Sequence, residues 1–228
     1  MINMYLCLIK HTLTIIGTMK KKIIFILNPI SGTVSKAGIP KLIEERLDKE
    51  TFDYDIAETE YAGHATEIAK KAAEEGVDIV VAIGGDGTVN EVGRALINTD
   101  TAMAILPCGS GNGLARHLRL PMNLKKCIDI INMCDIHSLD YGIINQHPFF
   151  CTCGMGFDAF ISMKFANAGK RGPITYVQQV LEEGVKYVPE TYEIEDEDGI
   201  QHYKAFLVSA ANASQYGNNA YIAPQASM

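Results

Sequence analysis

From residue 22 onward, short runs of apolar residues alternate with segments in which apolar residues recur at helical spacing. The short runs are rich in β-branched residues and apolar on both faces, which is typical of strands buried inside a sheet. The segments between them have the periodicity of amphipathic helices. Strands are predicted at residues 23–27, 54–57, 77–83 and 102–106, and helices at 41–47, 64–75, 89–97, near 114 and at 124–133. This alternation predicts one α/β domain over residues 19–137, with a parallel sheet covered on both faces.

The pattern changes after His137, where strand-like segments dominate. An Asp-Gly pair at residues 198–199 lies between two such segments, and this arrangement strongly favours a β-hairpin. Strands are predicted at residues 140–145, 147–153, 192–195 and 203–210, and a helix at 174–186. We therefore predict a second, mainly antiparallel domain over residues 138–228.

The first eighteen residues form an extension outside this pattern. They are moderately apolar, but Lys10 and His11 interrupt them, so the segment is too short and too polar to span a bilayer. The segment also lacks the basic start and small-residue exit of a signal peptide. Met19, followed by three lysines and the first strand, resembles a natural start. We expect residues 1–18 to be disordered and to have no role in the fold.

The charge and the cysteines exclude several classes of protein. The formal net charge of −7 at pH 7 argues against a general binder of nucleic acids or anionic membranes, because both need a broad basic face. The six cysteines include no C-x-x-C pair and give neither a disulfide framework nor a zinc site. The histidines show no metal-ligand spacing. This usage is typical of a reducing compartment and predicts a cytoplasmic protein.

Three of the predicted parallel strands end in polar, glycine-rich loops. The carboxyl ends of strands are where ligands bind in an open parallel sheet. The first loop is Asn28-Pro29-Ile30-Ser31-Gly32. The second, at residues 84–91, reads Gly-Gly-Asp-Gly-Thr-Val-Asn-Glu, and the third, at residues 107–113, reads Pro-Cys-Gly-Ser-Gly-Asn-Gly.

The second loop has the chemistry of a phosphate site. Successive glycines let the backbone turn tightly and approach a phosphate closely. Their N–H groups, together with the start of the following helix, form an anion site. Thr88 and Asn90 could add side-chain donors, and Asp86 could hold Mg²⁺ between the phosphates. An isolated Gly-Asp-Gly is more often only a tight turn, but the two further loops in register with it favour the phosphate site.

Other phosphate and catalytic motifs are absent or out of context. The P-loop pattern G-x-x-x-x-G-K-[ST] does not occur. Residues 154–159 fit G-x-G-x-x-A, but they lack a clear βαβ unit and the acidic residue that a dinucleotide site needs about twenty positions later. There is no G-x-S-x-G elbow, so hydrolase chemistry has no support.

Taken together, the loops resemble those of the diacylglycerol kinase catalytic domain family, which includes bacterial lipid kinases and sphingosine kinases. Residues 28–32, 84–91 and 106–112 resemble its three nucleotide loops, and residues 154–159 resemble a stretch early in its second domain. Gly-Gly-Asp-Gly alone is shared with NAD kinases and phosphofructokinases, whereas all four in this order are specific. The resemblance covers nearly all of residues 22–228. It implies a Rossmann-like parallel-sheet domain of the NAD kinase and diacylglycerol kinase type, followed by a β-sandwich lipid-binding domain.

The resemblance also implies a transferase that moves the γ-phosphoryl group of ATP to a diacylglycerol or sphingoid-like lipid hydroxyl, with Mg²⁺ as cofactor, in phospholipid metabolism. Thr59 belongs to the implied site because Thr59-x-x-x-Gly63-His64-Ala65 resembles the family segment that leads into the second helix. Asp86 is the plausible catalytic carboxylate, with a metal-linked or positioning role favoured, and no metal ligand is assigned. The implied nucleotide-binding residues are Asn28, Ser31, Gly32, Thr59, Gly85, Asp86, Gly87, Thr88, Val89, Asn90, Glu91 and Ser110.

Residues 223–228 resemble the start of a family segment that continues into an Asp-Gly turn and further strands. In bacterial members the later part supplies a structural magnesium site and the acidic general base, which would lie beyond Met228. We therefore expect an incomplete β-sandwich and a truncated chain, and the sequence leaves open whether this chain is active.

Two alternatives stay open beside the lipid kinase. One is an NAD kinase-like enzyme, against which the first loop and the Gly-Phe-Asp-Ala stretch at residues 156–159 argue. The other is a non-catalytic nucleotide-binding module. The expected partners are ATP and a lipid at a membrane surface, with peripheral contact at the inner membrane face and no nucleic acid. The sequence leaves the lipid, the nucleotide base and the oligomeric state open, a homodimer included.

Overall fold

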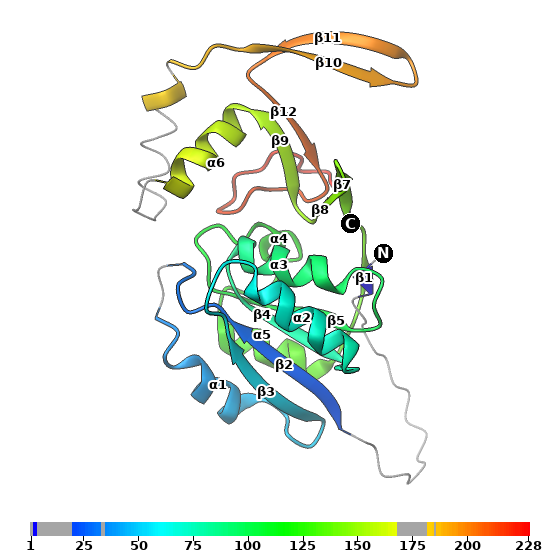
Figure 1. Cartoon of the computed structure of the whole chain (residues 1–228). Coiled ribbons are helices and arrows are strands. Elements are labelled where there is room, and N and C mark those ends of the chain that lie inside the picture. The colour runs from blue at the N-terminus through cyan, green and yellow to red at the C-terminus, as the bar shows by residue number, and fades with distance from the viewer. Residues whose placement is uncertain (1, 4–19, 33–34, 168–181, 185) are drawn as a thin grey trace. The chain divides into compact units, whose positions relative to one another are not determined.

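The structure is a computed structural model that describes residues 2–3, 20–32, 35–167, 182–184 and 186–228. The chain divides into two compact units, which can be followed by colour in Figure 1. The first unit comprises Met1–Cys151 together with Asn212–Met228, and the second comprises Thr152–Ala211. The chain therefore leaves the first unit after Cys151 and returns to it at Asn212.

A four-stranded parallel sheet forms the centre of the first unit. Its strands are β2 (Lys21–Leu27), β3 (Phe52–Glu58), β4 (Ile79–Gly84) and β5 (Ala102–Pro107), in the order β3-β2-β4-β5. All three neighbouring pairs are parallel. All six residues of β4 are buried, as expected for a strand covered on both faces. The predicted parallel sheet is confirmed.

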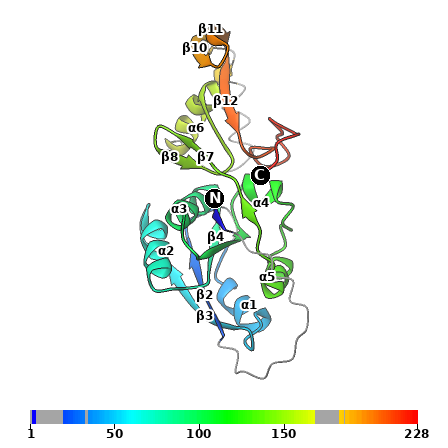
Figure 2. The ribbon, with the colours of Figure 1, turned by 90° about the vertical axis from the view of Figure 1, so that its right-hand side faces the viewer.

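Helices cover both faces of this sheet, and Figure 2 shows the two layers on either side of it. The helices are α1 (Ile39–Arg46), α2 (His64–Glu74), α3 (Asp86–Leu96), α4 (Gly113–His117) and α5 (Leu124–Met133). On one face α1 and α5 pack Ile43 and Ile128 against Phe25 and Val81. On the other face α2, α3 and α4 contribute to a second cluster around Ile26 and Val80. Each helix lies within a few residues of its predicted position.

Helix α3 begins three residues before the predicted start at residue 89. Gly85 is its N-cap, and the N–H of Val89 donates to the carbonyl of Gly85 at 3.1 Å. Glycine and threonine are poor helix formers, but the burial of Thr88 and Val89 outweighs their propensity. Most of the glycine-rich loop is therefore the first turn of a helix.

A short antiparallel hairpin follows the sheet in the first unit. Strand β7 (Gly142–Ile144) pairs with β8 (His147–Phe149), in agreement with the two neighbouring strands predicted there. Asn145 and Gln146 make the turn with positive φ angles of 47° and 68°. Phe150, directly after β8, packs so closely on α3 that a Cβ on Gly93 would lie 2.7 Å from its ring. This contact attaches the hairpin to the α/β layer.

The second unit contains antiparallel strand pairs and a helix that follows the first of these strands. Strand β9 (Thr152–Gly156) pairs with β12 (Leu207–Ala211), and β10 (Glu190–Asp196) pairs with β11 (Gly199–Ala205). Gly199 faces Asp196 at the tight end of the β10–β11 pair, so the predicted Asp-Gly hairpin is confirmed. Helix α6 (Phe157–Asn167) follows β9, whose partner is antiparallel, so residues 154–159 do not open a βαβ unit. The helix predicted at 174–186 lies almost wholly outside the described residues.

One strand predicted at residues 203–210 is split in two at Phe206. The carbonyl of Phe206 accepts the N–H of Phe157 at 3.0 Å, and their ring centroids lie 4.5 Å apart. Tyr187 joins the same aromatic cluster, 5.1 Å from Phe206. The alternation of side chains along a strand does not reveal packing of this kind, so the sequence does not predict the break at Phe206.

Residues 138–151 and 212–228 belong, by their contacts, to the first unit with the parallel sheet. The domain boundary near residue 138 stays a prediction.

In the N-terminal extension, β1 (Ile2–Asn3) pairs with β6 (Ser138–Leu139), which departs from the expectation that the extension has no role in the fold. The rest of residues 1–18 lies outside the described residues. No helix in the described part of the chain is long and apolar enough to cross a membrane.

Candidate functional site

The three glycine-rich loops meet at the carboxyl edge of the sheet. They follow β2, β4 and β5, which are direct neighbours, and main-chain hydrogen bonds continue past the ends of the strands. The N–H of Asn28 donates to the carbonyl of Ile83 at 3.0 Å, and the N–H of Cys108 donates to that of Gly84 at 2.8 Å. On the other side of β2, Thr59 is buried just past the end of β3, and its N–H donates to the carbonyl of Leu27 at 2.9 Å.

Glycines make the close approach of these loops possible. Gly32 has a φ of +65°, and a Cβ there would overlap the carbonyl oxygen of Cys108 in the third loop. A Cβ on Gly85 would lie 3.1 Å from the Cα of Gly109, and one on Gly109 would overlap the Cα of Gly85. Because the main chains touch where no side chain fits, the three loops form one continuous backbone surface.

The first loop is held by its own hydrogen bonds and by the second loop. The amide Nδ2 of Asn28 donates to the hydroxyl Oγ1 of Thr88 at 3.0 Å, and the hydroxyl of Ser31 donates to the carbonyl of Asn28 at 3.1 Å. Lys36, which sequence reasoning missed, is buried and its ammonium group donates to the carbonyl of Ser31. The pattern around Lys36 contains no signal that could have identified it, because its burial depends on the folded loop.

In the second loop, the main-chain groups and the side chain of Asn90 are available to a ligand, whereas the side chains of Thr88 and Val89 are not. The first N–H groups of α3 have no partner within the helix, and the helix dipole adds positive potential there. Thr88 is 3% exposed and directs its side chain beneath Gly84, while the side chain of Val89 belongs to the core. Asn90 is exposed, and the carbonyl of Glu91 accepts the hydroxyl of Thr66 at 3.0 Å. Glu91 therefore also ties α3 to α2.

Asp86 connects the second loop to the third. Its Oδ2 accepts the N–H of Asn112 at 2.9 Å, and its Oδ1 accepts the N–H of Gly113 at 2.6 Å. The residue as a whole is exposed, but its carboxyl group faces these donors. Desolvation by the surrounding loops raises the pKa of Asp86 above its ordinary value, and the N–H groups of Gly113 and Asn112 act in the opposite direction.

Asn112 closes the third loop on itself, a role that the sequence motif contains but does not reveal. Its φ is 54°, its Oδ1 accepts the N–H of Gly109 at 2.9 Å, and its Nδ2 donates to the carbonyl of Gly109 at 2.8 Å. Asparagine is one of the few residues that adopts this backbone region readily. The closed loop leaves Ser110 exposed at its tip.

The segment after Asn212 packs on the third loop within the first unit. Gly217 has a φ of +118°, and a Cβ there would lie 2.6 Å from the carbonyl of Gly111. The N–H of Ser214 donates to Nδ1 of His117 at 3.0 Å, so this ring nitrogen is an acceptor. Desolvation, with a contribution from Arg119, lowers the pKa of His117. The sequence placed this segment in the second domain, and nothing in its pattern indicated the contact.

No metal site is formed by protein side chains alone in the described ranges. There, no three His, Cys, Asp or Glu residues gather where they could hold an ion. Burial raises the pKa of Cys127 to about 11 and that of Cys151 to about 12. At neutral pH both are therefore thiols rather than nucleophilic thiolates.

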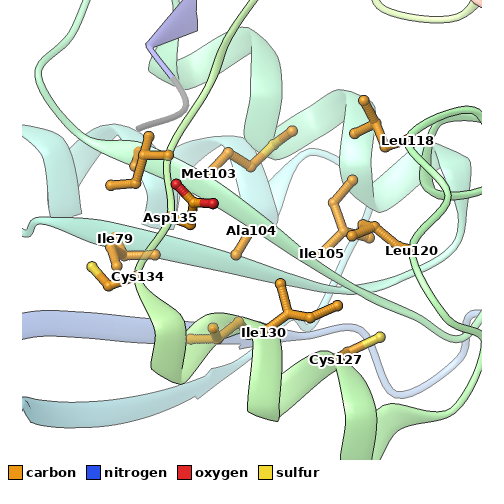
Figure 3. A pocket seen from close by; sticks show the side chains of 13 residues that line it. Ile79, Met103, Ala104, Ile105, Leu118, Leu120, Cys127, Ile130, Cys134 and Asp135 are labelled. Carbon is orange, nitrogen blue, oxygen red and sulfur yellow. The ribbon is translucent and has the colours of Figure 1, made fainter. Parts of the chain in front are cut away.

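An apolar cavity of about 80 Å³ lies between β5 and α5 (Figure 3). Ala104 on β5 and Ile130 on α5 point into it from opposite sides, and Asp135 is its one ionisable lining residue apart from the thiols of Cys127 and Cys134. Its other lining side chains are aliphatic or sulfur-containing. Such a lining suits neither phosphates nor Mg²⁺, so the loop edge is the candidate site for a nucleotide.

Comparisons with known proteins agree with this geometry. The family model described as "Diacylglycerol kinase catalytic domain" matches residues 22–144, and "YegS C-terminal NAD kinase beta sandwich-like domain" matches residues 151–228. A diacylglycerol kinase of Staphylococcus saprophyticus is 34% identical over 134 residues, which are 58% of this chain and 44% of that protein. A diacylglycerol kinase of Staphylococcus carnosus is 30% identical over 169 residues, which are 72% of this chain and 55% of that protein. The chain thus spans about half the length of these relatives.

A crystal structure of a diacylglycerol kinase from Bacillus anthracis strain Sterne superimposes with a TM-score of 0.67 at 25% identity. The superposition covers 90% of this chain and 68% of that one. Together with the second family model, this likeness supports the predicted order of a parallel-sheet domain followed by a β-sandwich-like domain. The chain belongs to the diacylglycerol kinase catalytic domain family.

Proposed function

We propose that this chain binds ATP at the loop edge and serves the transfer of the γ-phosphoryl group to a lipid hydroxyl, that of a diacylglycerol or a sphingoid-like alcohol. The observation that carries the proposal is the main-chain contact of Gly85 with Gly109 beside the start of α3. This close approach keeps side chains away from the first N–H groups of α3, as an approaching phosphate requires. Relatives named diacylglycerol kinase support the choice of a lipid acceptor.

The proposed nucleotide site comprises the twelve residues implied by the loops, with main-chain groups in the leading role. The N–H groups at the start of α3 would face the phosphates, where the helix dipole favours negative charge. Ser110 is exposed and can add a hydroxyl donor, and Ser31 orders the first loop. Thr88 and Val89 would contribute through the backbone, because their side chains are buried.

Mg²⁺ fits this site as a companion of the nucleotide rather than as an ion held by a protein cage. Both carboxylate oxygens of Asp86 already accept backbone N–H groups. Mg²⁺ keeps several waters and is commonly bound by substrate phosphates with one or two carboxylates. When bound, it would neutralise phosphate charge, while the residues of this chain orient the phosphates and exclude water. The proposed lipid partner lies at the inner membrane face, where a cytoplasmic protein would meet it by peripheral contact.

Titration calorimetry with ATP·Mg²⁺, followed by transfer of labelled phosphate to diacylglycerol or sphingosine vesicles, tests this proposal. We expect binding by the chain and label in the extracted lipid. Gly109→Ala should abolish binding, because its Cβ would overlap Gly85, whereas Gly38→Ala meets no atom within 4 Å and serves as the matched control.

Other outcomes separate the alternatives. Binding without transfer of label to any lipid favours a nucleotide-binding module. Formation of NADPH in a coupled assay, with NAD as the phosphate acceptor, favours an NAD kinase-like enzyme. No detectable ATP binding would overturn the proposed site. Competition by GTP measures the base preference.

A further inference from the structure

We infer that Asp86 is a positioning residue, whose carboxylate holds the third loop against the start of α3 in the arrangement that receives the nucleotide. The inference rests on the proposed ATP site and goes beyond it, because it assigns Asp86 to loop positioning instead of metal binding or proton transfer. The two hydrogen bonds from Asn112 and Gly113, at 2.9 Å and 2.6 Å, are its starting point.

The third loop needs an acceptor at the place where the Asp86 carboxylate lies. Helix α4 begins at Gly113, and the first N–H groups of a helix have no partner within it. The N-cap residue Asn112 would ordinarily supply one, but its side chain is committed to both main-chain groups of Gly109. Asp86, the first residue of α3, therefore caps α4 from another helix, with charge-assisted hydrogen bonds.

This cap couples the two loops mechanically. Asp86 offers its main chain to the start of α3 and its side chain to the start of α4, so a shift of one helix start moves the other. Contacts on the other sides leave little freedom, since a Cβ on Gly111 would lie 2.9 Å from Oδ2 of Asp86. Behind the loop, the N–H of Asn218 donates to the carbonyl of Gly111 at 3.3 Å. Without the carboxylate, the third loop loses its tie to the helix start.

Three roles for Asp86 predict three different results for Asp86→Asn, measured by calorimetry with ATP in the presence of Mg²⁺ or of EDTA and by the rate of phosphate transfer to lipid. The amide keeps one acceptor oxygen but turns an NH₂ group toward the second N–H donor. A positioning role predicts that affinity falls about tenfold or more, by the same factor with and without Mg²⁺. A metal ligand predicts a loss that is confined to Mg²⁺. A catalytic base predicts unchanged affinity and a loss of kcat alone.

The matched control is Asp78→Asn at the opposite end of β4. Asp78 also accepts a backbone N–H, that of Lys22 at 2.7 Å, but it lies away from the loop edge. Its nucleotide affinity should equal that of the wild type. If Asp86→Asn does not fold, as judged by circular dichroism, Gly111→Ala replaces it, because the new Cβ displaces the carboxylate without changing its charge.

The outcomes distinguish the inference from the proposed function. A Mg²⁺-independent loss of affinity in Asp86→Asn or in Gly111→Ala, with Asp78→Asn unchanged, supports positioning. Wild-type affinity in the folded variant, or a loss seen only with Mg²⁺, overturns it and leaves the ATP site standing. Failure of the wild type itself to bind ATP overturns the proposed site and the inference together.

Discussion

Asn28 and Thr88 join the first and second loops through one hydrogen bond, from the amide Nδ2 of Asn28 to the hydroxyl of Thr88 at 3.0 Å. Thr88 is 3% exposed and sixty positions further along the chain, so this bond is a tertiary contact. It couples the end of β2 to the first turn of α3, the helix that follows the neighbouring strand β4.

Removing this acceptor should weaken the fold measurably. Thr88→Val keeps the shape of the side chain but leaves the Asn28 amide without its partner, at a cost of about 1–2 kcal/mol in the free energy of unfolding. Thr88→Ser retains the hydroxyl and should lose only the methyl contact. Urea denaturation followed by circular dichroism measures both variants. Equal stability of Thr88→Val and the wild type would show that the bond contributes nothing.

Gly32 should tolerate no side chain. Gly32→Ala would have to keep a φ of +65°, which costs about 1–2 kcal/mol for a residue with a Cβ, and would also overlap the carbonyl of Cys108. We expect a lower melting temperature and weaker ATP binding. Gly38→Ala, at the N-cap of α1 with open space around it, should change stability by less than about 1 kcal/mol. A wild-type melting temperature for Gly32→Ala would contradict the close approach of the two loops.

The burial of His117 beside Ser214 should make stability depend on pH. Nδ1 of His117 accepts the N–H of Ser214, so protonation of this nitrogen breaks the bond. The pKa of His117 is lowered in the folded chain, which means that the unfolded chain binds its proton first as the pH falls. The stabilisation is therefore complete above the ordinary histidine pKa and is lost as the pH falls through the lower folded pKa.

Thermal melts between pH 7.5 and pH 5.5 measure this dependence. His117→Asn offers an oxygen acceptor that does not titrate, so its melting temperature should fall less over this range. The same slope in His117→Asn and in the wild type would remove His117 as its source.

The cavity between β5 and α5 should accept extra methyl groups. Ala104→Val adds two carbons to a side chain that points into the cavity (Figure 3), in a strand where β-branched residues are favoured. We expect a gain of about 1 kcal/mol in the free energy of unfolding. Ala82→Val, at a fully buried position of β4, should instead cost about 1–3 kcal/mol by overpacking. Chemical denaturation compares them, and a loss of stability in Ala104→Val would mean that the space cannot be filled.

Much of the first unit follows from its sequence because its elements obey local rules. The four strands are apolar on both faces and the helices have regular apolar spacing, so burial of these faces permits little besides a covered parallel sheet. Three loops at the ends of adjacent parallel strands must then share one edge, which is why the sequence alone groups Asn28, Gly85 and Ser110.

The tertiary structure alone decided how these residues are used. Thr88 and Val89 have the place of ligand contacts in the motif, but packing turns their side chains inward and extends α3 to Asp86. Asp86 has the chemistry of a metal ligand or base, yet the helix start at Gly113 supplies donors to both of its oxygens. These outcomes depend on contacts between residues more than twenty positions apart. Periodicity and motif spacing report only local preference, so the alternation of strands and helices and the three-loop edge were determined by the sequence, and the direction of each loop side chain was determined by the fold.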